Sequence, residues 1–490
     1  MKKIKQLFIL FTLSVASFSC TDVLDVEPTS VITTASFWQT ENDAQGALVG
    51  MYVNLRTIAT TDLYVLGEAR SDVLTLGIVG GGGWDKYYFN TLHADNAGPS
   101  WQNFYSLINS ANLIIKYVPD IDFASEENKN NILAQAYAMR AYAYYVMTRT
   151  WGDLPLRIEP TESTDAEVTQ IERSSQAEIF TLIKSDIDQA NQLFPDNSIH
   201  TDRSFWSKPG VNALKADVYL WSAKVLGGGQ SDLQTALSAI SEVESADVAL
   251  LDDYASVFAY ENKGNDEIIM AARFAEFEVG NNYHKDLYLI NSAIPSNITA
   301  ETRALIGPVG GGNNIIRPTD FMKSLYDVTD SRKDATFYEI FTLDDNGQPT
   351  VYYTTIGTKG SGTVSGGARL YVDDYIIYRY ADILLMKAEI KNALDQDPST
   401  EINQILMRAY GDNFAGKEFV SGTKAENDAF ILEERLRELA FEGKRWWDLI
   451  RFDKVLEMVP TLNNDSDKLL WPISSSILSL ETKVTQNPGY

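Results

Sequence analysis

Apolar residues recur every three or four positions along most of the 490-residue chain, a spacing typical of amphipathic helices. Thr40 is a suitable N-cap for a helix that runs to about Arg56, because the acidic residues Glu41 and Asp43 then lie in its first turn. The same spacing predicts further helices over 101–118, 126–150, 174–193, 208–226, 232–243, 375–394, 400–409 and 427–456. The chain is therefore expected to be mostly helical.

The segment from about 251 to 372 has a different pattern. It is rich in glycine, asparagine and tyrosine, and short alternating runs such as TVYYTTIG replace the helical period. Such runs predict short strands joined by loops. We expect this segment to be a loop-rich, partly β insertion on one face of a helical scaffold formed by about 35–250 and 373–460, within a single domain over 35–490.

Consecutive predicted helices share a sequence pattern in which alanine recurs with tyrosine or leucine, as in ALKADVYLWSA and ADILLMKAEIKNA. Paired helices of this kind are typical of tetratricopeptide-like hairpins. A helix pair cannot bury its apolar sides alone, so stacked pairs share one continuous core. No fixed period is kept through the insertion, and the pattern therefore indicates a divergent scaffold of helix pairs.

The stretch 431–452, ILEERLRELAFEGKRWWDLIRF, has a clear helical pattern. Leu432 and Leu436 lie on an apolar face, and acidic and basic residues fill the opposite face. Arg435 and Glu438 are one turn apart, which allows them to pair. Charge runs at helical spacing are usually solvated, so we expect the charged face to point toward water.

A second amphipathic run follows Gly443, which is expected to end or kink the first helix. Trp446 and Trp447 lead this run. Carboxylates beside two tryptophans are also found in glycosidase sites. A structural role is favoured, with a salt-bridged face and an aromatic core, and Trp446→Ala is then expected to cost stability rather than ligand affinity.

The charge balance narrows the classes of ligand. The chain carries a formal net charge of −26, and an acidic surface of this size repels nucleic-acid phosphates and anionic membranes. We therefore expect no nucleic-acid partner and instead a neutral ligand or a protein partner. Apolar content of 44% and aromatic content of 11% are sufficient for a large core, so the chain is not expected to be disordered.

The N-terminal residues indicate export and lipid attachment. Residues 1–19 combine the basic start MKKIK with an apolar run too short to span a bilayer, and they are interpreted as a signal peptide. Cys20, the only cysteine, follows directly and predicts cleavage before it, a lipid on its thiol and a tether over 20–34. The alternative is an ordinary signal peptide followed by an unmodified cysteine. With one cysteine, neither an intrachain disulfide nor a cysteine metal cluster can form.

The chain lacks the common catalytic motifs. His93, His200 and His284 are isolated in sequence, and no HExxH, GxSxG or phosphate-binding P-loop is present. Adjacent acids such as Asp373 and Asp374 are common in a chain with 67 acidic residues. The sequence therefore predicts no metal site, no cofactor and no enzymatic activity, although glycosidase carboxylates can lie far apart in sequence.

Aromatic residues in glycine- and asparagine-rich loops are the positive signal. Sugars bind flat rings through their C–H faces and use amide or charged groups for their hydroxyls. The candidate ligand-binding residues are Trp84, Tyr87, Asn282, Tyr283 and Tyr288. We expect the loops 80–89 and 281–288 to approach each other and to place Trp84 on an exposed face. The alternative is that each ring is a core residue beneath its loop.

The stretch ERLRELAFEGKRWWDLIRF resembles the C-terminal signature of the SusD/RagB family, the glycan-binding surface lipoproteins of Bacteroidetes nutrient uptake. Other stretches are similar to the same family: TASFWQTENDAQGALVGMY, AQAYAMRAYAYYVMTRTWGDLPL, YRYADILLMKAEIKNAL and the ending WPISSSILSLETKVTQNPGY. They are spread over the whole chain. The resemblance implies about four tetratricopeptide-like helix pairs under a loop-rich face, with ligand aromatics supplied by loops in the two regions above.

The family resemblance also implies a function. It implies a protein anchored to the outer membrane by lipid, at the cell surface, that captures an oligosaccharide or polysaccharide. The glycan would pass to a SusC-like TonB-dependent transporter without covalent chemistry. Two alternatives stay open: a lipid-anchored glycoside hydrolase, and a helical-repeat scaffold that holds a protein partner.

Overall fold

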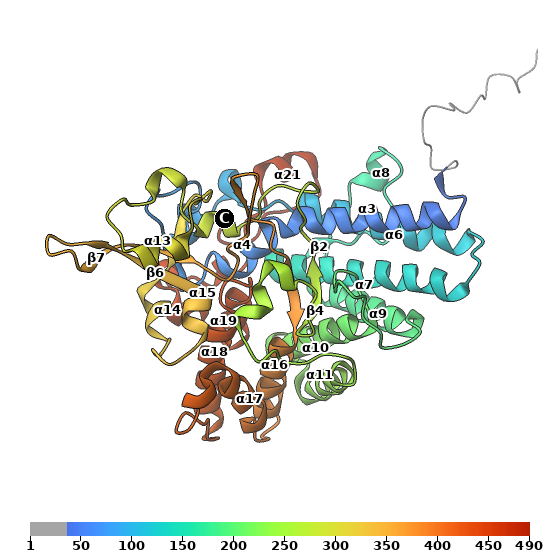
Figure 1. The fold of residues 1–490 in the computed structure, drawn as a ribbon. Helices are drawn as coiled ribbons and strands as arrows, with labels where there is room; N and C mark the ends of the chain where they lie inside the picture. Colours follow the sequence, from blue (N-terminus) through green and yellow to red (C-terminus); the bar gives the residue numbers. More distant parts are fainter. Residues whose placement is uncertain (1–36) are drawn as a thin grey trace, which may run out of the picture.

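The computed structural model describes residues 37–490 (Figure 1). The predicted signal peptide, Cys20 and the tether over 20–34 lie outside the described residues. Within 37–490, no helix is both long enough and apolar enough to cross a membrane.

Long helices form most of the described chain. They are α3 (Glu41–Ala59), α6 (Trp101–Tyr117), α7 (Glu126–Trp151), α9 (Gln176–Leu193), α10 (Lys208–Val225), α11 (Gly229–Glu244), α16 (Tyr380–Ala393), α17 (Ser399–Tyr410) and α18 (Lys424–Leu439). They pack in succession, α3 with α6, α7 with α9, α10 with α11, and α16 with both α17 and α18 (Figure 1). The prediction of a mostly helical, tetratricopeptide-like scaffold of helix pairs is confirmed.

Residues at the helix ends explain where several helices begin and end. Thr40 caps α3 through a reciprocal capping box with Asp43, in agreement with its predicted role as N-cap. Ser175 and Thr423 form the same kind of box at the starts of α9 and α18. Gly152 ends α7 with φ of 74°, a backbone conformation that other residues rarely adopt.

In the described chain, strands form only two-stranded antiparallel sheets. The pairs are β1 (Leu74–Leu76) with β5 (Ile316–Pro318), β2 (Leu154–Pro155) with β3 (Arg173–Ser174), β4 (Ile268–Ala272) with β10 (Tyr375–Arg379), β6 (Phe337–Leu343) with β7 (Pro349–Gly357), and β8 (Thr363–Ser365) with β9 (Ala368–Leu370). The β6–β7 hairpin projects at the left of Figure 1. The predicted helix 375–394 is wrong at its start, because residues 375–379 form β10.

Shorter helices connect these elements. They are α4 (Asp62–Glu68), α5 (Asp85–Tyr88), α8 (Ala166–Thr169), α12 (His284–Leu287), α13 (Ala300–Ile306), α14 (Asp320–Ser324), α15 (Arg332–Thr336), α19 (Arg445–Arg451), α20 (Val455–Met458) and α21 (Ser475–Leu480). The predicted helix 427–456 is divided into α18, α19 and α20. Phe441 and Gly443 have φ of 64° and 70°, so the helix cannot continue through them. The interruption predicted at Gly443 is confirmed.

The charged face of α18 is buried, so the predicted solvated face is wrong. Glu434 and Glu438 are 0% exposed, and Arg435 is also buried. Arg435 pairs with Asp382 at 3.0 Å and Asp448 at 2.9 Å rather than with Glu438. The physical reason is long-range: arginines from β10, α15 and α17 lie over this face and compensate its carboxylates.

The turn between α18 and α19 is fixed by a carboxylate from α4. Glu68 accepts hydrogen bonds from the backbone N–H groups of Phe441 at 3.0 Å, Lys444 at 3.1 Å and Arg445 at 3.3 Å. Burial raises the pKa of Glu68 to about 7, although these hydrogen bonds oppose the shift. The stretch 431–452 is thereby joined to the N-terminal part of the chain, which favours its structural role.

Candidate functional site

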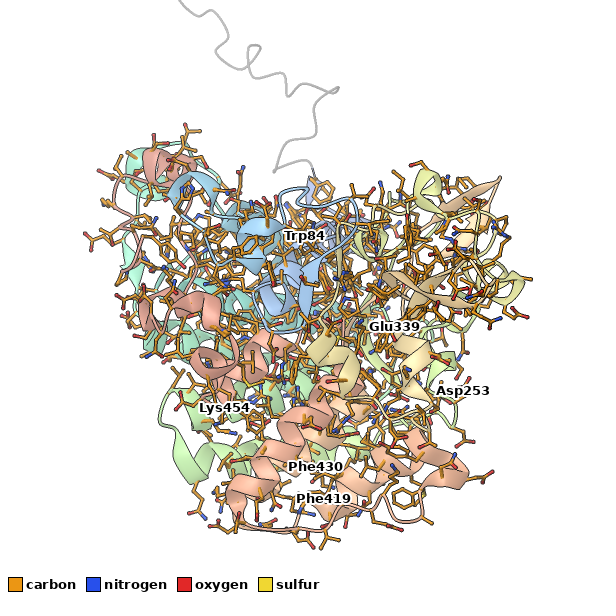
Figure 2. All side chains as sticks on the ribbon, turned by 90° about the vertical axis from the view of Figure 1, so that its left-hand side faces the viewer. Trp84, Asp253, Glu339, Phe419, Phe430 and Lys454 are labelled. Carbon is orange, nitrogen blue, oxygen red and sulfur yellow. The ribbon has the colours of Figure 1, made fainter. Side chains whose placement is uncertain are left out.

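Trp84 directly follows the glycine run and is the residue before α5, and Tyr87 lies within that helix. Trp84 is 7% exposed and Tyr87 is 8% exposed, so both rings are buried. Their ring centroids are 5.6 Å apart, and the ring of Tyr64 on α4 lies 6.0 Å from that of Trp84. Figure 2 shows Trp84 among neighbouring side chains. The loop therefore directs its tryptophan into the core rather than toward solvent.

The second predicted loop reaches the same place through Tyr283. Its buried ring stacks on Tyr64, with 3.9 Å between the ring centroids and 15° between the ring planes. Its hydroxyl donates a hydrogen bond to the backbone oxygen of Phe441 at 2.8 Å. Tyr64 thus contacts both Trp84 and Tyr283, and the predicted approach of the two loops is confirmed.

Asn282 and Tyr288 make other contacts inside the protein. The side-chain amide of Asn282 donates to the backbone oxygen of Asp373 at 2.7 Å. The ring of Tyr288 packs against Tyr371 at 5.8 Å, and its hydroxyl donates to the backbone oxygen of Ile306 at 2.8 Å. Tyr288 belongs to an apolar cluster separate from the one that holds Trp84 and Tyr283.

The exposed aromatic face predicted from these residues is wrong. All five candidates are buried: Trp84, Tyr87, Asn282, Tyr283 and Tyr288. Packing of one ring against another is favourable, and the side chains of Asn282, Tyr283 and Tyr288 donate to backbone oxygens. A sugar can reach these rings only after the loops move apart.

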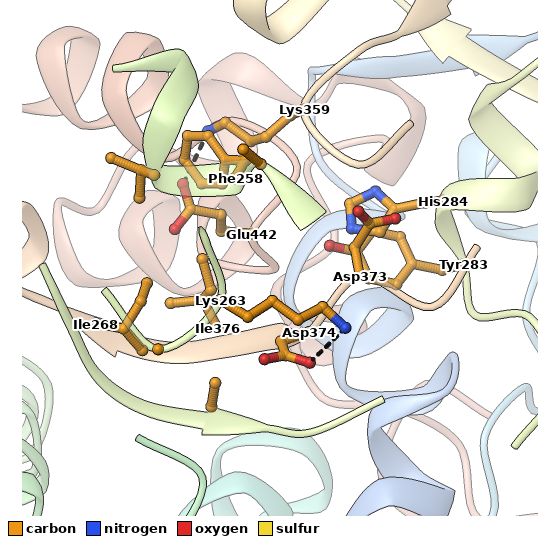
Figure 3. Close-up of a pocket in the computed structure, with 14 residues that line it drawn as sticks. Phe258, Lys263, Ile268, Tyr283, His284, Lys359, Asp373, Asp374, Ile376 and Glu442 are labelled. Carbon is orange, nitrogen blue, oxygen red and sulfur yellow. Dashed lines mark hydrogen bonds and ion pairs between the residues drawn. The ribbon is translucent and has the colours of Figure 1, made fainter. Parts of the chain in front are cut away.

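A small cavity beside Tyr283 and His284 gathers charged groups (Figure 3). Its volume of about 30 Å³ is enough for about two water molecules and excludes a sugar ring. Lys359 donates to Glu442 at 2.8 Å, and burial lowers the pKa of Lys359 to about 8. Burial lowers the pKa of His284 to about 3, so this imidazole is neutral near pH 7. The cavity is part of the packed interior, and no group of histidine, cysteine and acidic side chains in residues 37–490 could hold a metal ion.

A larger concave site lies along α6. A groove of about 590 Å³ runs between α6, the segment 157–170 and α21. This volume is within the range of pockets that hold small-molecule ligands. In Figure 1, α8 and α21 lie at the upper edge of the molecule. Side chains that line the groove include Trp101, Gln102, Tyr105, Asn109, Arg157 and Glu481.

Hydrogen bonds across the groove hold its walls together. The Arg157 guanidinium donates to the backbone oxygens of Val168 at 3.1 Å and Thr169 at 2.6 Å, and it pairs with Glu481 at 3.3 Å. The side-chain amide of Gln170 donates to a backbone oxygen of α21 at 2.9 Å. These contacts join the segment 157–170 to the C-terminal part of the chain, so the groove is formed before a ligand arrives.

The groove combines a fixed aromatic ring with amide groups. Tyr105 is half-buried, its ring lies 5.9 Å from that of Trp101, and its hydroxyl donates to a backbone oxygen of β2 at 2.6 Å. Asn109 accepts from the backbone N–H of Thr161 at 2.7 Å through its oxygen, which leaves its NH₂ group for a ligand. Gln102 is exposed. This lining suits a ring that carries hydroxyl groups.

The charge of the groove disfavours anions. Glu159 and Glu481 line it, and Arg157, the basic residue of the lining, is already paired with Glu481. A phosphate, sulfate or carboxylate group on a ligand would meet uncompensated negative charge. The groove therefore fits a neutral ligand rich in hydroxyls.

Sequence reasoning missed this groove because its walls come from segments that are far apart in the chain. The helix α6 was interpreted only as an amphipathic scaffold element. Trp101, Tyr105 and Asn109 lie four residues apart and therefore share one helix face. That mixture of aromatic and amide side chains at one helical spacing is the signal in the sequence that indicates the site.

The fold and the groove define a helical-repeat protein with a ligand-sized site. Two family models match the chain: the SusD family model over residues 343–490, and a model described as starch-binding and associating with the outer membrane over residues 22–220. The chain belongs to the SusD family.

Similarity to known proteins extends over the full chain. SusD-like protein P38 of Formosa agariphila is 29% identical, and the alignment covers 100% of both chains. Among solved structures, B. fragilis NanU is 33% identical with a TM-score of 0.85, and the match covers 95% of this chain and 100% of that chain. A SusD superfamily protein from Bacteroides vulgatus is 28% identical with a TM-score of 0.83, and the match covers 92% of this chain and 100% of that chain.

Proposed function

We propose that this protein is a cell-surface lipoprotein that captures a neutral oligosaccharide in the groove along α6 and delivers it to a SusC-like TonB-dependent transporter in the outer membrane. The observation that carries the proposal is a ligand-sized groove with a fixed tyrosine ring beside amide groups. Membership of the SusD family supports it. So does the family model described as starch-binding, which spans residues 22–220 and includes most of the groove lining.

Binding in this proposal needs no covalent step and no cofactor. The ring of Tyr105 stacks on the C–H face of a sugar, and Gln102 and Asn109 exchange hydrogen bonds with its hydroxyls. The walls are already joined by Arg157 and Gln170, so little conformational entropy is lost when the sugar enters. Delivery to the transporter then requires only dissociation of an unmodified glycan.

Tyr105→Ala should weaken glycan binding by about tenfold or more, because stacking on an aromatic ring contributes roughly 1–3 kcal/mol. Tyr105→Phe should bind almost as tightly as the parent, since it keeps the ring and loses only the hydroxyl that donates to β2. The measurement is a titration of the chain lacking residues 1–20 with a neutral glycan selected on an array.

Tyr352→Ala is the matched control, because it removes a tyrosine ring that is 39% exposed on β7, outside the groove. Equal binding by the parent and Tyr105→Ala would show that the glycan binds elsewhere. Turnover of the glycan by the pure protein would favour the glycoside-hydrolase alternative. Tight binding of a protein partner without any glycan binding would favour the scaffold alternative.

The anchor and the transporter form the second part of the proposal. Cys20→Ala should leave the protein unattached to the membrane, because the thiol that carries the lipid is missing. Pull-down of the detergent-extracted native protein should recover a large β-barrel partner. A stable complex of this kind should bury more than about 2,000 Å².

Mass spectrometry of the native N-terminus checks the anchor directly, and an unmodified Cys20 would contradict lipidation. Recovery of this chain alone, under conditions that preserve other outer-membrane complexes, would count against the transporter partnership.

A further inference from the structure

A second groove lies at the end of the helical scaffold where α3 and α7 begin, at the right of Figure 1. Its volume is about 420 Å³, which is also within the range of ligand pockets. Its walls are α3, α7 and the segment 194–207 that joins α9 to α10. Polar side chains that line it include Glu41, Gln45, Asn131, Gln135, Asp196 and His200.

Hydrogen bonds inside this second groove hold its polar groups in place. The buried side chain of Gln135 accepts from the hydroxyl of Tyr52 at 2.7 Å and donates to Asn131 at 2.5 Å. Glu41 accepts from the side-chain amide of Asn128 at 3.2 Å. These contacts order the hydrogen-bonding groups before a ligand arrives, which lowers the entropy lost on binding.

Other polar groups of the lining are left for a ligand. Within residues 37–490, the side-chain amide of Gln45 and the NH₂ group of Asn131 have no hydrogen-bond partner. His200 lies 2.6 Å from Asp202 through Nδ1, and its second ring nitrogen has no partner in the described chain. Gln45 and His200 are exposed, so a ligand in the groove can reach both.

An aromatic wall completes the second groove. The half-exposed ring of Phe205 packs edge-on against Tyr52 at 4.7 Å and against His200 at 5.0 Å. The buried Trp206 follows it, and its backbone N–H donates to the hydroxyl of Tyr52 at 2.7 Å. The Phe205 ring therefore has a fixed orientation at the groove, which stacking on a sugar requires.

We propose that this groove is a second carbohydrate-binding site, which takes a neutral sugar unit of the same glycan, and this inference rests on the function proposed above. The lining contains Glu41 and Asp196 and no lysine or arginine, so anionic groups are disfavoured. Amides, carboxylates and an imidazole beside a ring match a ring that carries hydroxyls. An apolar ligand would leave these polar groups unpaired, which is costly.

Two sites on one protein raise the affinity for a polymer more than for a short oligosaccharide. The two grooves share no lining residue, and the first lies on α6 whereas the second lies on α3 and α7. When one groove holds a segment of a polymer, the other groove meets further segments at a high effective concentration. A short oligosaccharide that fills one groove gains nothing from this effect.

The test places substitutions in each groove. Gln45→Ala/His200→Ala removes two exposed polar groups of the second groove, and Tyr105→Ala removes the ring of the first. Retardation in native gels that contain soluble starch, laminarin, xylan or galactomannan measures binding to each neutral polymer. For the polymer that retards the parent, Gln45→Ala/His200→Ala should weaken binding about tenfold. Addition of Tyr105→Ala should abolish it.

Gln234→Ala, on the exposed side of α11, is the control and should be retarded as the parent is. The second site would be overturned if Gln45→Ala/His200→Ala is retarded as the parent is while Tyr105→Ala loses retardation. That result would leave the proposed function standing. A parent that no polymer retards would overturn both. Retardation by polygalacturonate in place of the neutral polymers would overturn the assignment of a neutral ligand.

Discussion

Arg379→Met should lower the free energy of unfolding by about 3–5 kcal/mol, because it removes one cation from a network of buried carboxylates and leaves their negative charge only partly compensated. Arg379 is fully buried on β10 and bridges three carboxylates, those of Glu267 at 2.7 Å, Glu438 at 2.6 Å and Glu442 at 2.8 Å. Methionine keeps much of the packing and removes the charge. Since Glu267 and Glu438 are also fully buried, water cannot take the place of the guanidinium.

Urea-unfolding midpoints measure this loss. Arg303→Met, which removes an exposed arginine, is the control and should change stability by less than about 0.5 kcal/mol. Addition of Glu267→Gln to Arg379→Met should restore part of the loss, because one buried carboxylate is then neutral. A normal midpoint for Arg379→Met would show that the scaffold does not depend on this network.

The buried network around Arg379 also makes the stability loss of Arg379→Met depend on pH. Burial alone would raise the pKa of Glu438, but the charges of Arg408, Arg379 and Arg332 outweigh it and hold this pKa well below its usual range. Its stabilising contribution is therefore present above the unfolded pKa of about 4.3 and is lost as the pH falls through the folded pKa. In Arg379→Met, Glu438 keeps Arg408 and Arg332 but loses one of its cations, and protonation therefore removes part of the cost of a less compensated carboxylate. The difference in stability between parent and variant should therefore narrow in acid.

Local patterns were sufficient to predict the helical scaffold. The start of α3 at Thr40 is fixed by a capping box within one turn. The apolar spacing that predicts a helix likewise involves only residues three or four positions apart. The same reasoning missed β10 because YIIYRYADILLM is mostly apolar and contains no glycine or proline to mark a break between strand and helix. Residues 375–379 form a strand because they pair with β4, which lies far away in sequence.

Contacts between distant segments could not be predicted from these patterns. Arg435 was expected to pair with Glu438 one turn away, but Asp382 of α16 and Asp448 of α19 are its partners. The glycine run before Trp84 suggested that the indole ring is exposed. In the structure this ring packs against the buried ring of Tyr64 on α4. Trp84→Ala therefore removes core contacts. The groove along α6 likewise exists only because three separate segments meet.

Trp446→Ala should also lower the free energy of unfolding by about 3–5 kcal/mol, the usual range for a large buried aromatic side chain. Trp446 is fully buried on α19. The guanidinium of Arg70 lies 4.7 Å from its ring centroid and 5.1 Å from that of Trp471, so the indole is part of a stack that holds a buried cation. Removal of the indole leaves a cavity and takes away one of the rings that Arg70 contacts.

Glycan affinity of the folded Trp446→Ala protein should hardly change, because Trp446 lines neither groove. Thermal unfolding and glycan titration of the same preparation separate the two effects. Phe89→Ala removes a ring that is 48% exposed and should therefore keep a nearly normal melting temperature. A Trp446→Ala protein with normal stability and no glycan binding would show that this tryptophan acts in recognition, and the structural role of the stretch 431–452 would then be wrong.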